Sequence, residues 1–116
     1  MTLAEMMTSE LHPAIPTDRS LLIVEDDKSF LQRLAKALEA RGFIVETAET
    51  VAEGLRKVAN NAPAFAVVDM RLGDGNGLDV ISALKRERPE ARALILTGYG
   101  NIATAVNAVK LGAVDY

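Results

Sequence analysis

The chain has 116 residues, of which 49% are apolar and 25% charged, with 16 acidic and 13 basic side chains and a net charge of -3. This length suits one domain with a single hydrophobic core, and the lack of cysteine excludes disulfide-stapled folds, thiolate catalysis and cysteine-bound metal centres and favours a cytoplasmic location. The acidic balance argues against nucleic-acid binding by this segment, and the longest apolar run, Ala62 to Val68, is too short to cross a membrane.

The N-terminal residues 1–19 predict a flexible leader, because they contain two prolines and no sustained hydropathy period. The apolar run Leu21–Val24 then predicts a buried strand. Apolar residues at helical spacing follow from Lys28 and predict an amphipathic helix that ends before Gly42. We therefore expect the domain to occupy residues 20–116.

The same alternation of strand and helix continues along the chain. Residues 43–45 predict the second strand, and Thr50 with Glu53 forms a potential capping box at the start of the next helix. The expected apolar stripe of that helix consists of Val51, Leu55 and Val58. Further strands are predicted at 64–68, 93–96 and 114–116, and further helices at 78–88 and 101–111. Alternating elements with short connections predict an α/β fold, a doubly wound parallel sheet between layers of helices.

Polar side chains follow the predicted strands, where function collects in sheets of this class. Glu25 and Asp26 come after the first strand, Asp69 after the third and Thr97 after the fourth, and Tyr116 lies at the fifth. Because the carboxyl ends of parallel strands meet at one edge, we expect these side chains to converge. Crowded carboxylates repel one another unless a cation neutralises them, and an all-oxygen cluster suits a hard ion such as Mg²⁺.

A carboxylate at such a site can also act as a nucleophile that forms an aspartyl phosphate. Asp69, at the middle strand, is the candidate nucleophile, and Asp26 is a candidate metal ligand. Thr97 is placed to hydrogen-bond the arriving phosphoryl group. The glycine-rich loop 73–77 would turn the backbone sharply behind Asp69.

Four motifs together carry a resemblance to a known family. They are Val24-Glu25-Asp26, Val68-Asp69 followed by Asn76-Gly77, Leu96-Thr97-Gly98, and Gly112-Ala113-Val114-Asp115-Tyr116. The set resembles the receiver domain of two-component response regulators. The runs 67–77 and 96–116 are most similar to the RegA/PrrA/ActR group of redox-responsive regulators, in which a receiver precedes a helix-turn-helix DNA-binding domain. The resemblance implies a CheY-like, flavodoxin-like sheet with strand order 2-1-3-4-5.

The resemblance also implies roles for the residues at the strand ends. Asp69 corresponds to the phosphoacceptor, which a sensor histidine kinase phosphorylates. Asp26 corresponds to the direct Mg²⁺ ligand, Glu25 to its water-mediated companion, and the backbone carbonyl of Arg71 to a third protein ligand. The domain would then be a reversible switch, not an enzyme acting on an external metabolite.

The C-terminal part of the family pattern is only partly present. Thr97 corresponds to the switch hydroxyl and Tyr116 to the switch aromatic, but the family lysine falls three residues beyond Tyr116, with most of the fifth strand and the fifth helix. We therefore expect a C-terminally incomplete receiver without its effector domain and with weakened phosphorylation. The exposed edge of the fourth strand would favour a homodimer or an element-swapped dimer, unless the leader folds back over it.

Two other classes of protein stay open at this point. One is a receiver-shaped interaction module that takes no phosphate. The other is a Mg²⁺-dependent phosphohydrolase or nuclease, although such enzymes usually carry an Asp-x-Asp pair at one strand end, which the run Asp69-Met70-Arg71 lacks.

Three further charged features have structural interpretations. Asp27 is expected to cap the first helix. Asp74 is expected to be a turn residue in a glycine-rich loop that does not fit the G-x-G-x-x-G nucleotide motif. The basic run Lys85–Arg88 is expected to be a solvated helix end, where positive charge complements the helix dipole.

Overall fold

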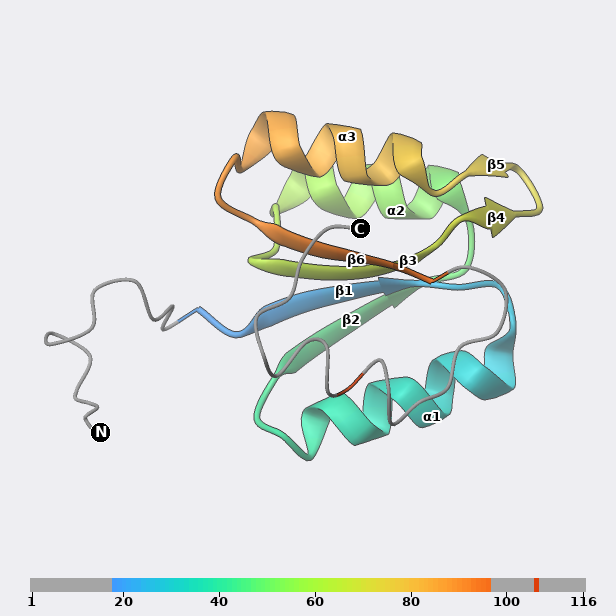
Figure 1. The fold of residues 1–116 in the computed structure, drawn as a ribbon, viewed down its shortest axis with the longest axis vertical. Coiled ribbons are helices and arrows are strands. Elements are labelled where there is room, and N and C mark those ends of the chain that lie inside the picture. Colours follow the sequence, from blue (N-terminus) through green and yellow to red (C-terminus); the bar gives the residue numbers. More distant parts are fainter. Residues whose placement is uncertain (1–17, 97–105, 107–116) are drawn as a thin grey trace, which may run out of the picture.

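The computed structural model describes residues 18–96 and Val106, which form a parallel sheet flanked by helices (Figure 1). The strands of the sheet are β1 (Ser20–Val24), β2 (Ile44–Ala48), β3 (Phe65–Asp69) and β6 (Arg92–Leu96). The helices are α1 (Lys28–Glu39), α2 (Val51–Asn60) and α3 (Leu78–Glu87). A short antiparallel hairpin of β4 (Arg71–Leu72) and β5 (Gly75–Asn76) follows β3.

The strand order β2-β1-β3-β6 confirms the doubly wound, flavodoxin-like sheet, with β6 as the predicted fourth strand. The β4–β5 hairpin was not predicted, because glycines in the sequence indicated only a loop there. The predicted fifth strand at 114–116 lies outside the described residues. So does the predicted helix 101–111, except for Val106, which is helical and buried in the core. The predicted leader also lies outside them up to residue 17.

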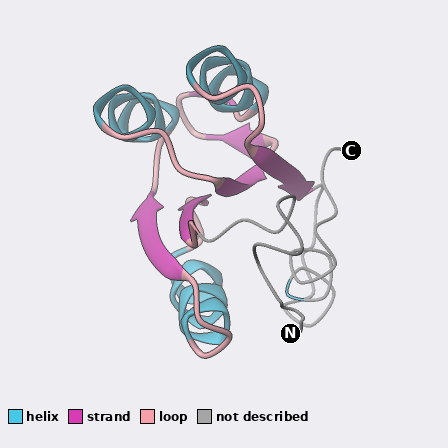
Figure 2. Ribbon diagram, turned by 90° about the vertical axis from the view of Figure 1, so that its left-hand side faces the viewer, coloured by secondary structure: helices cyan, strands magenta, loops and turns pink. Residues whose placement is uncertain are grey.

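The sheet lies between α1 on one face and the α2–α3 pair on the other (Figure 2). Leu21 and Ile23 of β1 pack with α1, whereas Leu22 and Val24 pack toward α2 and α3. All four side chains are at most 1% exposed. This two-sided burial explains why the strand is a continuous apolar run and not an alternating one.

The sequence predicts where the helices begin more accurately than it predicts which of their faces are buried. Asp27 caps α1 as predicted, since its Oδ1 accepts a hydrogen bond from the Phe30 N–H at 3.1 Å. At α2 the predicted stripe is wrong at Leu55, which is 36% exposed. Gly54 is buried instead of Leu55. It lies so close to Val24 and Val80 that an added Cβ would be only 3.2 Å from a methyl group of each. The missing side chain thus lets α2 pack close to the sheet and α3.

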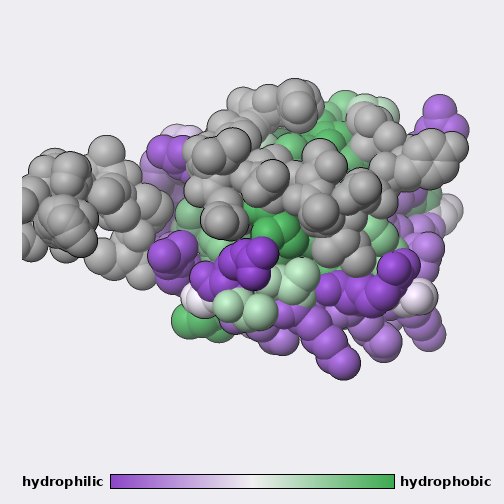
Figure 3. Space-filling view, turned by 60° about the horizontal axis from the view of Figure 1, so that its bottom comes forward, coloured by the Kyte–Doolittle hydropathy of each residue, from purple (hydrophilic) through white to green (hydrophobic). Residues whose placement is uncertain are grey.

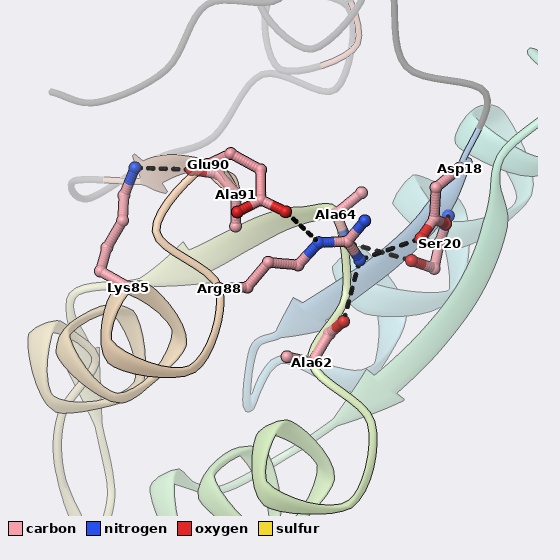
Figure 4. Close-up of polar contacts among 8 residues, drawn as sticks. All are labelled: Asp18, Ser20, Ala62, Ala64, Lys85, Arg88, Glu90 and Ala91. Carbon is pink, nitrogen blue, oxygen red and sulfur yellow. Dashed lines mark hydrogen bonds and ion pairs between the residues drawn. The ribbon is translucent and has the colours of Figure 1, made fainter.

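Arg88 binds residues that precede three strands of the sheet, β1, β3 and β6 (Figure 4). Its Nη1 donates to the Ala62 carbonyl at 3.0 Å and pairs with Asp18 at 2.9 Å, and its Nε contacts Glu90 at 3.2 Å. Asp18 also accepts a hydrogen bond from the Ser20 N–H. The expected solvated basic run is therefore wrong at Arg88, whose side chain is only 25% exposed. The contacts of Asp18 attach the last residues of the predicted leader to the domain.

The surface on the α1 side carries mainly hydrophilic described residues, with apolar ones gathered near the centre of the view (Figure 3). At the sheet edge, Ile44 of β2 is 70% exposed. Among residues 18–96, no helix combines the length and the hydropathy that a membrane span requires.

Candidate functional site

Three carboxylates meet at the carboxyl edge of the sheet. Glu25 and Asp26 follow β1, and Asp69 is the last residue of the neighbouring strand β3. Val24 and Val68 are paired in the register of the two strands, so the acids that follow them are brought side by side. One carboxylate oxygen from each acid lies within 4.8 Å of the others. The predicted convergence of Glu25, Asp26 and Asp69 is therefore found in the structure.

The three acids differ in their access to solvent. Glu25 is 7% exposed and is the one charged residue that is buried in the described part of the chain. Its Oε2 accepts a hydrogen bond from the Asp27 N–H at 2.9 Å, which fixes the orientation of the carboxylate. Asp26 is exposed and Asp69 is half-buried. A partner molecule can thus reach Asp69 more readily than Glu25.

Burial and mutual repulsion shift the protonation of this cluster. The pKa of Glu25 is raised from 4.5 to about 7, chiefly by burial; the charges of Asp69 and Asp26 contribute to this rise, and the hydrogen bond from the Asp27 N–H opposes it. Burial also raises the pKa of Asp69, and the charge of Asp26 adds to the effect, while the N–H of Arg71 opposes it. The pocket is therefore an unfavourable place for three negative charges without a cation.

The backbone after Asp69 is held close to the site. The Arg71 N–H donates to Asp69 Oδ1 at 3.4 Å, and the Met70 N–H donates to the Leu96 carbonyl at 3.1 Å. The Gly77 N–H donates to the Met70 carbonyl at 2.8 Å, which closes the loop. A Cβ at Gly77 would lie 2.0 Å from the Asp69 carbonyl oxygen, so this close approach requires glycine.

Asp74 has a role that sequence reasoning missed. It lies in the turn of the hairpin, as predicted, but its carboxylate also accepts hydrogen bonds from the N–H groups of Val51 and Ala52 at 2.8 and 3.1 Å. It therefore caps α2 from a distant loop. No local pattern could have signalled this contact, because the partners are more than 20 residues apart.

The remaining predicted site residues, Thr97 and Tyr116, lie outside the described residues. Leu96, which directly precedes Thr97, pairs in register with Asp69. The switch roles of Thr97 and Tyr116 stay predictions.

The donor set of the pocket suits a hard divalent cation. Carboxylate and backbone oxygens are the ligands that Mg²⁺ and Ca²⁺ prefer, whereas zinc and copper sites usually include histidine nitrogen or cysteine sulfur. A cation here would also offset the repulsion that raises the pKa values of Glu25 and Asp69. Fold and site thus define an α/β protein whose parallel sheet carries, at its carboxyl edge, a cluster of three acids that suits a divalent cation and includes the half-buried Asp69.

Comparison with known families agrees with this class. Residues 21–116 match the family model of the response regulator receiver domain. The chain belongs to the response regulator receiver family.

Curated relatives support the predicted subgroup. The acid tolerance regulatory protein ActR of Sinorhizobium medicae (strain WSM419) is 65% identical over 102 residues, which are 88% of this chain and 53% of that protein. The photosynthetic apparatus regulatory protein RegA of Rhodobacter capsulatus is 60% identical over 110 residues, 95% of this chain and 60% of that protein. The resemblance to the RegA/PrrA/ActR group is thereby confirmed. The chain spans about half the length of these relatives.

A solved structure gives the same picture. A response regulator protein from Burkholderia pseudomallei, crystallised with a phosphorylated aspartic acid, a calcium ion and citrate, has a TM-score of 0.66 and 43% sequence identity. The similarity covers 83% of this chain and 56% of that one. In that protein a phosphorylated aspartate and a divalent cation occur in one structure.

Proposed function

We propose that this domain is a phosphorylation switch in which Asp69 accepts a phosphoryl group from a sensor histidine kinase. The observation that carries the proposal is the cluster of Glu25, Asp26 and Asp69 at the carboxyl edge of a receiver fold. Asp69 is the acceptor because it ends the central strand β3 and is half-buried, whereas Glu25 is enclosed. A carboxylate oxygen of Asp69 would attack the phosphorus of the phosphohistidine, and the bond from phosphorus to the imidazole nitrogen would break.

We propose Mg²⁺ as the cation of this site. The residues that would hold it are Asp26, Asp69, the backbone carbonyl of Arg71 and, through water, Glu25. When bound, the cation neutralises charge on the phosphoryl and carboxylate oxygens. The Asp27 N–H orients the carboxylate of Glu25 at 2.9 Å, and the Arg71 N–H makes a longer, weaker contact with Asp69 at 3.4 Å. Thr97 and Tyr116 are proposed to read out the phosphoryl group.

The proposal covers the rest of the predicted biology as well. Residues 20–116 would be the receiver of a longer protein that regulates transcription; the relatives ActR and RegA are named as regulatory proteins, and AlgB of Pseudomonas putida as a transcriptional regulatory protein. DNA binding would belong to another domain, and the protein would act in the cytoplasm as a switch and not as an enzyme on an external substrate. A homodimer or element-swapped dimer through the edge of β6 also remains a proposal.

Beryllofluoride with Mg²⁺, followed by NMR, tests the function. We expect amide shifts centred on Asp69 and its loop, and covalent labelling of Asp69 by acetyl phosphate in mass spectrometry. Asp69→Asn should abolish both signals, whereas Asp79→Asn, which changes an exposed acid in the first turn of α3, should keep them. Turnover of a phosphate ester would instead support the phosphohydrolase, and no response would support the interaction module.

A further inference from the structure

The β4–β5 hairpin carries Arg71 beside the acidic site, yet it has little structure of its own. Its two strands have two residues each and form only the pairs Arg71–Asn76 and Leu72–Gly75. A ribbon of this size is not stable in isolation. Its place on the domain must therefore come from contacts with other elements.

The base and the tip of the hairpin are fixed in different ways. At the base, the Gly77 N–H donates to the Met70 carbonyl at 2.8 Å. At the tip, Asp74 reaches the first turn of α2, which lies next to the hairpin in Figure 1. Between these anchors, Leu72 is buried in the same cluster as Val51 of α2.

The contact of Asp74 is strong for a surface group. One carboxylate oxygen accepts the Val51 N–H at 2.8 Å and the other accepts the Ala52 N–H at 3.1 Å. These two hydrogen bonds lower the pKa of Asp74, so the group stays charged at neutral pH. A negative charge at a helix N-terminus is also favoured by the helix dipole.

The position of Arg71 depends on this arrangement. Its N–H to Asp69 Oδ1 distance, 3.4 Å, is long for a hydrogen bond, so this contact alone holds the two residues loosely. A hairpin released at its tip would be held only by its base and by the burial of Leu72, which leaves the Arg71 backbone free to shift relative to Asp69. The anchor at α2 is therefore one of the contacts that fix the hairpin, and with it Arg71, beside Asp69.

We propose that Asp74 is a positioning residue of the phosphoacceptor site, which it serves by clamping the β4–β5 hairpin on the N-terminus of α2. The inference rests on the proposed function, because it concerns the Arg71 carbonyl as a ligand of the cation at Asp69. It goes beyond that function by assigning a role to a residue that touches neither the cation nor the phosphoryl group.

The test compares two caps of the same helix. Asp74→Ala removes the clamp, whereas Thr50→Ala removes the hydrogen bond from the Glu53 N–H to the Thr50 hydroxyl, which caps α2 without involving the hairpin. Both variants should lose stability. The Mg²⁺ affinity, measured by NMR titration where circular dichroism shows both variants folded, should fall about tenfold in Asp74→Ala, in line with losses of residues that orient metal ligands. It should be unchanged in Thr50→Ala.

Each outcome has a defined meaning. Equal Mg²⁺ affinities for Asp74→Ala and Thr50→Ala, in a wild type that binds Mg²⁺ and beryllofluoride, would overturn the role of Asp74 alone. A wild type that binds neither would refute the proposed function itself. If Asp74→Ala fails to fold, Asp74→Asn replaces it, since an amide oxygen can accept only part of the original contact. We then expect a smaller loss of affinity, and wild-type affinity in that variant would overturn the inference.

Discussion

The pKa of Glu25 predicts an unusual dependence of stability on pH. In the folded, cation-free protein the pKa is about 7, against an ordinary value of 4.5 that we take for the unfolded chain. Between these values the folded state binds the proton and the unfolded state releases it. Folding is therefore favoured by protons, and the free energy of unfolding should fall as the pH rises from about 4.5 to about 7.

The size of the effect follows from the two pKa values. One pKa unit corresponds to 1.36 kcal/mol, so a rise from 4.5 to about 7 makes a difference on the order of 3 kcal/mol. This is a large part of the 5–15 kcal/mol by which native proteins are typically stable, according to the general range. Glu25→Gln keeps an oxygen that can accept the Asp27 N–H but has no charge, and it should remove most of this dependence.

The assay is urea denaturation followed by circular dichroism at several pH values between 4.5 and 8.5, with a chelator present. Wild type should lose stability between pH 4.5 and about 7 and change little above that, and Glu25→Gln should be more stable than wild type at pH 8. Glu87→Gln, which changes an exposed acid at the end of α3, should follow wild type. Parallel curves for wild type and Glu25→Gln, or a wild-type stability that rises with pH, would refute the reasoning.

Two substitutions test the backbone around the site. Gly77→Ala should cost about 3 kcal/mol of unfolding free energy and abolish Mg²⁺ binding, since its Cβ would overlap the Asp69 carbonyl oxygen. Gly73→Ala, with nothing within 4 Å of its Cβ, should stay within about 0.5 kcal/mol of wild type in the same urea titration; similar losses would contradict the packing argument. Asp27→Ala should cost about 1 kcal/mol, because the Phe30 N–H loses its cap, and Asp27→Ser should restore most of it in thermal melts. An Asp27→Ala variant as stable as wild type would show that the cap contributes nothing.

Much of the site could be predicted because it depends on chain order and on parallel pairing. Once Leu21–Val24 and residues 64–68 are buried neighbouring strands, Glu25, Asp26 and Asp69 must leave the sheet at one edge. Capping of α1 by Asp27 could be predicted equally well, since the N–H donor belongs to Phe30, only three residues along the chain. Such features need only local patterns and one topological rule.

The parts that sequence reasoning missed depend on packing between distant segments. Leu55 was expected inside, but the close contact of Gly54 with Val24 and Val80 turns the buried face of α2 away from it. Arg88 was expected in solvent, yet it joins Asp18 and other groups from separate loops. Hydropathy and residue spacing predict neither the exposure of Leu55 nor the contacts of Arg88, because both depend on how whole helices and strands are placed relative to one another.

The cluster of Glu25, Asp26 and Asp69 couples the protonation of Glu25, the binding of a cation and the stability of the fold. A proton on Glu25 and a cation among Glu25, Asp26 and Asp69 relieve the same repulsion, so they compete, and each stabilises the folded state in place of the other. Mg²⁺ should therefore add little stability at pH 5, where the proton is bound to Glu25, and more stability at pH 8. Mg²⁺ binding near pH 7 should also release protons. Calorimetry in buffers of different ionisation enthalpy measures how many are released. A stability gain from Mg²⁺ that is the same at both pH values would mean that Glu25 does not sense the cation. The buried glutamate would then have only a structural role, in its hydrogen bond with Asp27.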